Sequence, residues 1–143
     1  GLALTSREMK VHGKNYAADL IRNAQALGSA LDTAGVPVEA KEFGFTQSHQ
    51  IAINVSSFGP GKEIARRLAE SNIICNYNML PGDQDPRNPS GLRIGVQEMT
   101  RCGMGPEQMG ELAELMTAVI AKQKSVTNEV VQLRSRFSEV RYC

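Results

Sequence analysis

The chain has 143 residues, the usual size of one compact domain. It carries 16 basic and 15 acidic residues, and the resulting formal net charge of +1 argues against a nucleic-acid partner, which would select a strongly basic surface. Charged residues at 22% and hydrophobic residues at 41% exclude a disordered composition, and the absence of an apolar run of roughly 20 residues argues against a membrane partner.

The first predicted element is a long helix over residues 6–31, where apolar residues recur at helical spacing. Gly35 is expected to end this helix, and Pro37 cannot continue it. The pattern then changes to the alternation typical of strands, first at residues 36–38 and again at 51–55. We expect these two strands to be neighbours.

A second helix is predicted over residues 62–71 by the same spacing argument. The apolar residues 73–75 predict a third strand, and the alternating residues 92–96 predict a fourth. The segment 81–89 between them contains three prolines, so neither a helix nor a strand ladder can run through it. We therefore expect a loop there.

Two further helices are predicted, one from Pro106 to Ile120 and one over residues 126–137. This order of elements implies an α+β fold, in which a small mixed or antiparallel sheet is covered on one face by helices. We assign residues 1–143 to one domain, with 1–34 as a connecting helix and 35–143 as the α+β unit. No glycine-rich fingerprint or Walker loop predicts a nucleotide site.

The three cysteines of the chain are odd in number and widely spaced, at positions 75, 102 and 143. This pattern suits neither a disulfide framework nor a zinc site, and it favours a reducing compartment, the cytoplasm. The chain opens with Gly-Leu-Ala and no initiator Met, so we expect it to be part of something longer.

Arg93 is the strongest candidate for chemistry, because it stands at the centre of an otherwise apolar strand directly after the proline-rich loop. Its planar guanidinium can bind a carboxylate through two hydrogen bonds, which suits an amino acid or another small acid. Gly91 and Gly95 would let a ligand approach closely. The residues alone leave a second interpretation open, a structural ion pair on the exposed face of an edge strand.

Other polar residues give weaker signals. The amides of the Asn76-Tyr77-Asn78 segment could read a heterocycle, although asparagine also ends strands. His49 could act as an acid, a base or a turn residue. His12 is far away in the sequence, and neither histidine has a ligand partner at metal-binding spacing, so we expect no metal. Ser90 lacks the nucleophile-elbow pattern, and Cys75 is most simply a small core residue.

Four ordered motifs resemble the serine hydroxymethyltransferase family. They match its Asn-Lys-Asn-x-x-Pro, Asp-Pro-Arg/Lys-Ser-Pro, Ser-Gly-Ile/Leu-Arg-Ile/Val-Gly and Thr-Arg-Gly segments. In this sequence they are Asn76-Tyr77-Asn78-Met79-Leu80-Pro81, Asp85-Pro86-Arg87-Asn88-Pro89, Ser90-Gly91-Leu92-Arg93-Ile94-Gly95 and Thr100-Arg101-Cys102-Gly103. Residues 46–50 resemble the family's Thr-Asp-Asn-His-Leu segment, and residues 23–27 resemble part of its long connecting helix. The resemblance covers nearly all of the chain.

This resemblance implies a pyridoxal-phosphate enzyme of the aspartate-aminotransferase-like fold, of which the chain matches the C-terminal small domain. The large domain, with its Schiff-base lysine, is not matched, so we expect no catalysis, no catalytic residue and no cofactor-binding residue in this chain alone. The family moves a one-carbon unit between serine and tetrahydrofolate and yields glycine. By position, Arg93 matches the arginine that binds the substrate carboxylate, and Asn78 matches the asparagine that contacts the folate pterin; His49 is treated as structural.

The family's dimers share residues across their interface, so the resemblance also implies a homodimer or a higher homo-oligomer. The sequence departs from the family around the loop, where Pro89 leads directly into Ser90 and the segment 83–85 adds a residue. Two alternatives therefore stay open. One is a pyridoxal-phosphate aldolase, or a hydroxymethyltransferase for another β-hydroxy or α-methyl amino acid or another pterin. The other is a non-catalytic amino-acid-binding domain.

Overall fold

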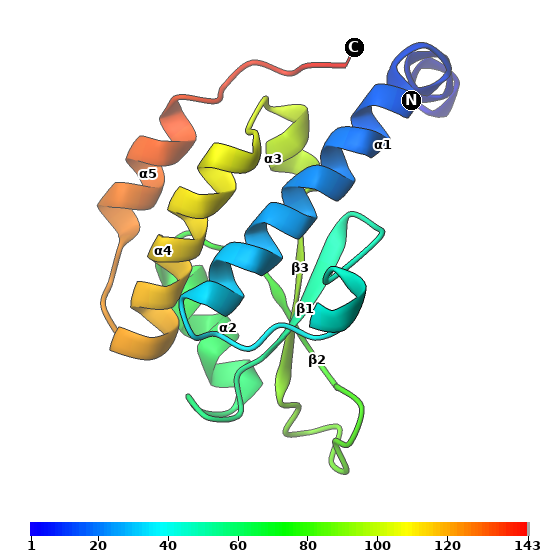
Figure 1. Cartoon of the computed structure of the whole chain (residues 1–143). Coiled ribbons are helices and arrows are strands. Elements are labelled where there is room, and N and C mark those ends of the chain that lie inside the picture. Colours follow the sequence, from blue (N-terminus) through cyan, green and yellow to red (C-terminus); the bar gives the residue numbers. More distant parts are fainter. Residues whose placement is uncertain (143) are drawn as a thin grey trace.

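The computed structural model describes residues 1–142, which form helices and strands in a mixed order (Figure 1). The elements are α1 (Leu2–Thr33), a short 3-10 helix (Lys41–Phe43), β1 (Gln50–Asn54), α2 (Gly61–Glu70), β2 (Asn76–Asn78), β3 (Gly91–Gly95), α3 (Gln97–Arg101), α4 (Pro106–Lys122) and α5 (Thr127–Ser135). The loop between β2 and β3 projects from the lower end of the molecule in Figure 1. This confirms the predicted loop and the α+β class.

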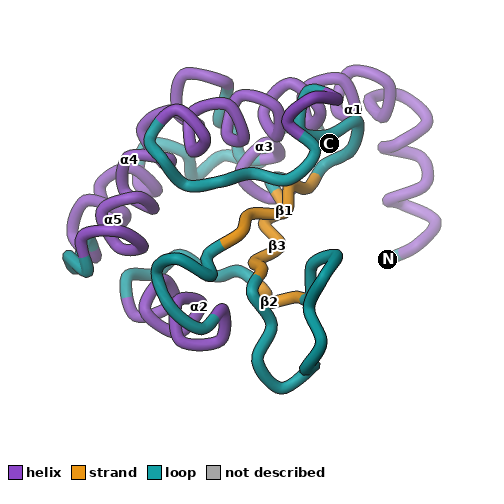
Figure 2. Tube along the Cα trace, turned by 60° about the horizontal axis from the view of Figure 1, so that its bottom comes forward, coloured by secondary structure: helices purple, strands orange, loops and turns teal. Residues whose placement is uncertain are grey.

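The three strands form one antiparallel sheet in the order β1-β3-β2 (Figure 2). All five residues of β3 pair with β1, and Ala52 lies opposite Arg93 on that side. On the other side β2 pairs only with the first part of β3, and Asn76 lies opposite Arg93. Arg93 is therefore on the central strand, so the alternative interpretation is wrong in placing it on an edge strand.

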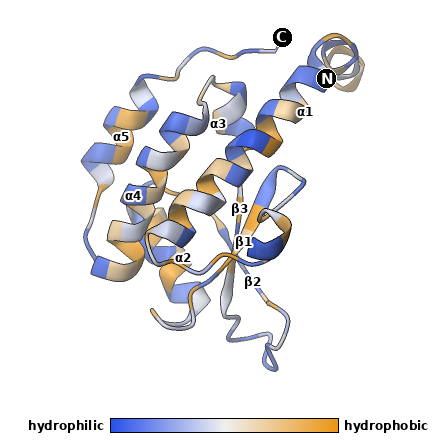
Figure 3. Ribbon diagram, viewed as in Figure 1, coloured by the Kyte–Doolittle hydropathy of each residue, from blue (hydrophilic) through white to orange (hydrophobic). Residues whose placement is uncertain are grey.

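One face of this sheet is buried against the helices. Along β1 and β3 the buried residues alternate with more exposed ones, as expected of a sheet with one covered face. Figure 3 shows hydrophobic and hydrophilic residues mixed along α1 and α4, as in amphipathic helices. The core joins the covered face of the sheet to three helices. The strands contribute Ile51, Ile53, Leu92 and Ile94. Helix α1 contributes Leu27 and Leu31, α2 contributes Ile64 and Leu68, and α4 contributes Met109 and Met116. The predicted one-sided cover is confirmed.

Two strand predictions differ from the structure. The third strand is not at residues 73–75 but directly after them, at 76–78. Ile73 enters the core whereas Ile74 is 89% exposed, so this run connects α2 to the sheet. The first predicted strand is a single bridge between Val38 and Ile53, since Pro37 has no N–H with which to extend a ladder.

Helix α1 is fixed to the start of α3 and the turn after it by polar contacts. The buried amide of Asn23 donates hydrogen bonds to Thr100 Oγ1 and to the Met104 carbonyl, both at 2.9 Å. The Tyr16 hydroxyl donates to the Gln97 carbonyl at 2.9 Å.

The short helix α3 was not predicted, because five residues are too few to show a helical period. In the described part of the chain, no helix has the length and apolarity needed to cross a bilayer.

Candidate functional site

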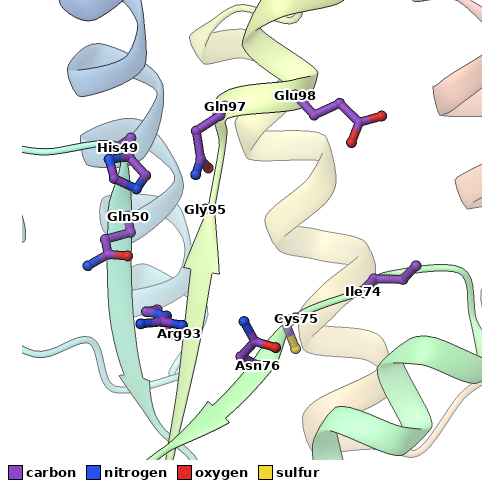
Figure 4. A pocket seen from close by; sticks show the side chains of 9 residues that line it. All are labelled: His49, Gln50, Ile74, Cys75, Asn76, Arg93, Gly95, Gln97 and Glu98. Atoms are coloured by element: carbon purple, nitrogen blue, oxygen red, sulfur yellow. The ribbon is translucent and has the colours of Figure 1, made fainter. Parts of the chain in front are cut away.

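The open face of the sheet carries a pocket of about 560 Å³ around Arg93 (Figure 4). Its walls come from the three strands, from the segments that lead into β1 and β2, and from the start of α3. The lining residues are His49, Gln50, Ile74, Cys75, Asn76, Arg93, Gly95, Gln97 and Glu98. Segments far apart in the sequence thus meet at one polar hollow.

Arg93 lies at the middle of this open face, in the central strand and between two short neighbours. Ala52 stands opposite it on β1 and Asn76 on β2, so no bulky side chain flanks it in the ladder. The arginine is exposed, and within residues 1–142 its guanidinium has neither an ion-pair nor a hydrogen-bond partner. The described residues thus give no support to a structural ion pair, and the guanidinium donors are available to a ligand.

The remaining polar groups of the pocket are amides, an imidazole and one acid. Gln50, Asn76 and Gln97 provide side-chain amides, which can both donate and accept hydrogen bonds. Glu98 is the only carboxylate among the described lining residues, and Figure 4 shows it on the side away from His49 and Gln50. An anion would therefore be favoured at the Arg93 side of the pocket, away from this carboxylate.

His49 lines the pocket from the segment that leads into β1. Its main-chain carbonyl accepts a hydrogen bond from the Val96 N–H at 3.0 Å, which continues the pairing of β1 and β3 by one step. The backbone of His49 therefore takes part in the sheet pairing, while the residue also lines the pocket, where an imidazole could act as an acid or a base.

Cys75 is half-buried and contributes to the pocket wall, so it is more than the core residue predicted from its apolar neighbours. Burial raises the pKa of the Cys75 thiol to about 11. The thiol is therefore almost wholly protonated near neutral pH and is a poor nucleophile there.

Asn78 faces the same side of the sheet as Arg93 but does not line the pocket. It pairs with Gly91 in the register that places Asn76 opposite Arg93, so Asn78 and Arg93 are neighbours on the open face. The structure thus brings both predicted site residues onto one surface. Asn78 is half-buried and stands at the entrance to the proline-rich loop.

Asp83 closes that loop at its base. One carboxylate oxygen accepts hydrogen bonds from the N–H groups of Leu80 and Ser90, both at 2.9 Å. These donors, Ser90 first, hold the pKa of the Asp83 carboxyl below its usual range. This role of Asp83 was not predicted, although an aspartate directly after Pro-Gly is a typical turn signal. Within residues 1–142, no cluster of histidine, cysteine or acidic side chains could hold a metal ion.

The family model and the curated relatives agree on one family. The family model described as serine hydroxymethyltransferase matches residues 2–116. A relative named serine hydroxymethyltransferase from Methanocella arvoryzae is 45% identical over 148 residues, which cover 100% of this chain and 35% of the relative. Another relative of that name, from Saccharolobus islandicus, is 48% identical. That match covers 98% of this chain and 34% of the relative. The chain thus spans about a third of the length of these relatives.

A solved structure gives the same answer for the fold. The crystal structure of L-threonine transaldolase from Pseudomonas fluorescens, in its internal aldimine state, superposes with a TM-score of 0.84 at 27% sequence identity. The match covers 95% of this chain and 32% of the transaldolase. The arrangement of α1, the sheet and the C-terminal helices is therefore found within a much longer enzyme.

Proposed function

The chain belongs to the serine hydroxymethyltransferase family, and we propose that it is the C-terminal, substrate-binding part of an enzyme that moves a one-carbon unit between serine and a tetrahydrofolate carrier, producing glycine. The observation that carries this proposal is Arg93, whose unpartnered guanidinium stands at the centre of the open sheet face, at the motif position of the carboxylate-binding arginine. Residues 1–34 would form the connecting helix, and 35–143 the small domain.

Arg93 binds the substrate carboxylate in this proposal. A guanidinium and a carboxylate form two parallel hydrogen bonds, which fix the direction of the substrate as well as its position. The central strand is paired on both sides of Arg93, so the arginine backbone is held rigidly. A substrate held in this way presents the same bond to the reacting groups at each turnover, and such orientation accounts for much of enzymatic rate acceleration.

The family implies pyridoxal phosphate, which supplies an electron sink for bond cleavage next to the amino group when it is bound. The described residues of the Arg93 pocket do not include a lysine that could hold the cofactor aldehyde. They fit the carboxylate of an amino acid instead. We therefore propose that the cofactor is held outside this chain, and that residues 1–143 alone are inactive.

Asn78 is proposed to contact the pterin ring of the one-carbon carrier. Its amide can donate and accept at once, which matches the edge of a pterin, and it lies on the same open face as Arg93. The proposal extends to a homodimer or higher homo-oligomer and to a cytoplasmic location. Cys75 and Cys102, which are both free thiols, suit a reducing compartment.

The test uses the protein expressed from its complete gene and supplied with pyridoxal phosphate. Arg93→Ala should raise the apparent KM for serine by about a hundredfold and also lower kcat, because two hydrogen bonds to a charged group are lost and the substrate is misplaced. Arg93→Lys should recover only part of this loss, since lysine cannot bind bidentately. Unchanged serine kinetics in Arg93→Ala would remove Arg93 from the site.

A matched control for the charge is Arg87→Ala. Arg87 lies on the exposed loop, where it pairs with Asp85, and it is not among the residues that line the pocket. Its removal should leave the serine kinetics unchanged. A fall in affinity for both variants would indicate a long-range effect of charge rather than binding by Arg93.

A second candidate function is a pyridoxal-phosphate aldolase acting on another β-hydroxy amino acid. The similarity to L-threonine transaldolase favours it, as does the altered loop beside Asn78. The two functions are separated by adding glycine with and without tetrahydrofolate and recording the visible spectrum of the cofactor. A response that needs the folate supports the hydroxymethyltransferase. A response indifferent to folate supports the aldolase, and a protein without a cofactor band supports a non-catalytic binding domain.

A further inference from the structure

The side-chain amide of Gln97 lies directly on the backbone of Gly95, inside the Arg93 pocket (Figure 4). A Cβ atom at position 95 would stand 2.2 Å from Gln97 Oε1 and 3.2 Å from Nε2. A contact of 2.2 Å is impossible, so any other residue at position 95 would displace the amide. The position of Gln97 therefore depends on a glycine in the strand.

The main chain of Gln97 is anchored from two sides. Gln97 is the first residue of α3, and its carbonyl accepts the hydrogen bond from the Tyr16 hydroxyl on α1. The preceding residue, Val96, donates its N–H to the His49 carbonyl at 3.0 Å. These two hydrogen bonds hold the backbone at the start of α3 against the rim of the pocket, so the Gln97 side chain begins from a fixed point at that rim.

The Gln97 amide has no hydrogen-bond partner of its own within residues 1–142, although the acid beside it, Glu98, also lines the pocket. Gly95 and Arg93 are two positions apart on β3, so they share the open face and lie about 7 Å apart along the strand. The amide over Gly95 and the guanidinium of Arg93 thus face the same hollow, and Figure 4 shows the Gln97 side chain extending along β3 in the direction of Arg93.

We propose that the side-chain amide of Gln97 donates a hydrogen bond to the substrate carboxylate that Arg93 binds, and that Gly95 makes this contact sterically possible. The inference rests on the proposed function of Arg93. A carboxylate offers about four acceptor positions, and a bidentate arginine occupies two of them, so a third donor can be accommodated. Gln97 is then a determinant of selectivity for amino acids with a free carboxylate.

The test compares the affinities for glycine and for glycinamide, which lacks the carboxylate. The protein is expressed from its complete gene, loaded with pyridoxal phosphate and titrated with each compound by calorimetry. Gln97→Ala should weaken glycine binding about tenfold or more, because hydrogen bonds to charged groups are the stronger ones, and should change glycinamide binding less than about twofold. Gly95→Ala should have the same effect by displacing the amide.

Two further variants separate contact from folding. Gln97→Glu keeps the shape of the side chain but places a negative charge in the pocket, so it should bind glycine more weakly than Gln97→Ala does. A merely structural role for Gln97 predicts the opposite order, because the larger isostere preserves packing. Gln47→Ala removes an exposed glutamine that does not line the pocket and should leave both affinities unchanged.

The outcomes also distinguish this inference from the proposed function. If Arg93→Ala abolishes glycine binding while Gln97→Ala leaves it unchanged, the role of Gln97 is overturned and that of Arg93 stands. If Gln97→Ala weakens glycine and glycinamide equally, Gln97 acts on the fold and the inference is likewise overturned. If the unsubstituted protein does not bind glycine, both proposals fail.

Discussion

The hydroxyl of Tyr16 donates a hydrogen bond to the main-chain carbonyl of Gln97, 2.9 Å away, across 81 positions of sequence. This bond links the long helix α1 to the first residue of α3, and thereby to the rim of the Arg93 pocket. Burial is the largest cause that raises the pKa of the Tyr16 phenol, so the phenol remains a donor well into the alkaline range.

Tyr16→Phe should lower the free energy of unfolding by about 0.5–1.5 kcal/mol, the usual net contribution of one hydrogen bond. Urea unfolding followed by circular dichroism measures this change. Tyr77→Phe is the control, because Tyr77 is exposed and has no hydrogen bond through its hydroxyl within residues 1–142. An equal effect of both substitutions would mean that the Tyr16 bond adds nothing to stability.

Asn23→Ala should destabilise the protein more than Tyr16→Phe does. Asn23 is 1% exposed, and its amide donates to Thr100 and to the Met104 carbonyl. The substitution leaves buried acceptors unpaired, which costs about 1–3 kcal/mol. Urea unfolding again gives the change, and Asn15→Ala on the exposed side of the same helix should be nearly neutral. A neutral Asn23→Ala would contradict the role of Asn23 in fixing α1.

Gly61→Ala should be destabilising by roughly 1–3 kcal/mol, because the new methyl group would meet rigid backbone. A Cβ there would lie 2.6 Å from the Pro89 carbonyl oxygen and 3.1 Å from that of Gly91. Gly110 is the matched control, since a Cβ at that position of α4 meets nothing within 4 Å. Gly110→Ala should raise the free energy of unfolding by up to about 1 kcal/mol through helix propensity. Thermal unfolding of the two variants should therefore shift in opposite directions, and shifts of the same sign would refute the clash.

Asp83 should make the stability of the protein depend on pH in the acid range. Its pKa is lower in the folded protein than in the unfolded chain, because Ser90 and Leu80 donate to the carboxylate. The unfolded state then binds the proton more readily, so the stabilisation is present above the ordinary carboxyl pKa and is lost as the pH falls through the lower, folded value.

Asp83→Asn should therefore reduce the difference in unfolding midpoint between pH 7 and pH 3. Glu139→Gln is the control, because Glu139 is exposed and makes no ion pair within the described residues. Both variants are followed by urea unfolding across this range. An Asp83→Asn protein with the acid sensitivity of the unsubstituted chain would show that the hydrogen bonds from Leu80 and Ser90 to Asp83 do not contribute to it.

Cys75 should react slowly with iodoacetamide at neutral pH. Its thiol pKa of about 11 leaves a very small thiolate fraction there, and this fraction grows about tenfold per pH unit up to that value. Peptide mapping by mass spectrometry separates Cys75 from the other two cysteines. A labelling rate at neutral pH equal to that of free cysteine would contradict the raised pKa.

The sequence predicted the helices and the central strand better than the edge of the sheet. Leu27, Met109 and Leu133 follow strong helical periods, and each is buried as that pattern requires. Strand β2 was placed too early because its own residues, Asn76 to Asn78, are polar and only backbone pairing makes them a strand. The pattern of hydrophobic residues does not predict such backbone pairing.

The site was predictable only in part, for a related reason. Arg93 stood out because a charge in an apolar strand breaks the local pattern. Gln97 gave no such signal, because a glutamine at the start of a helix is ordinary and its role depends on Gly95 having no side chain. Such a contact arises from the bend between β3 and α3, and the spacing of hydrophobic residues along the sequence does not predict that bend.

The two hydrogen bonds that Asp83 accepts at the base of the loop have a consequence for how this chain tolerates change. Because one carboxylate joins the two ends of the loop, residues 84–88 can be lengthened, shortened or exchanged while Leu80 and Ser90 stay in place. The strands that carry Asn78 and Arg93 are then insulated from such insertions and deletions. Changes in the loop, in evolution or in the laboratory, would then leave the sheet face around Arg93 unaltered.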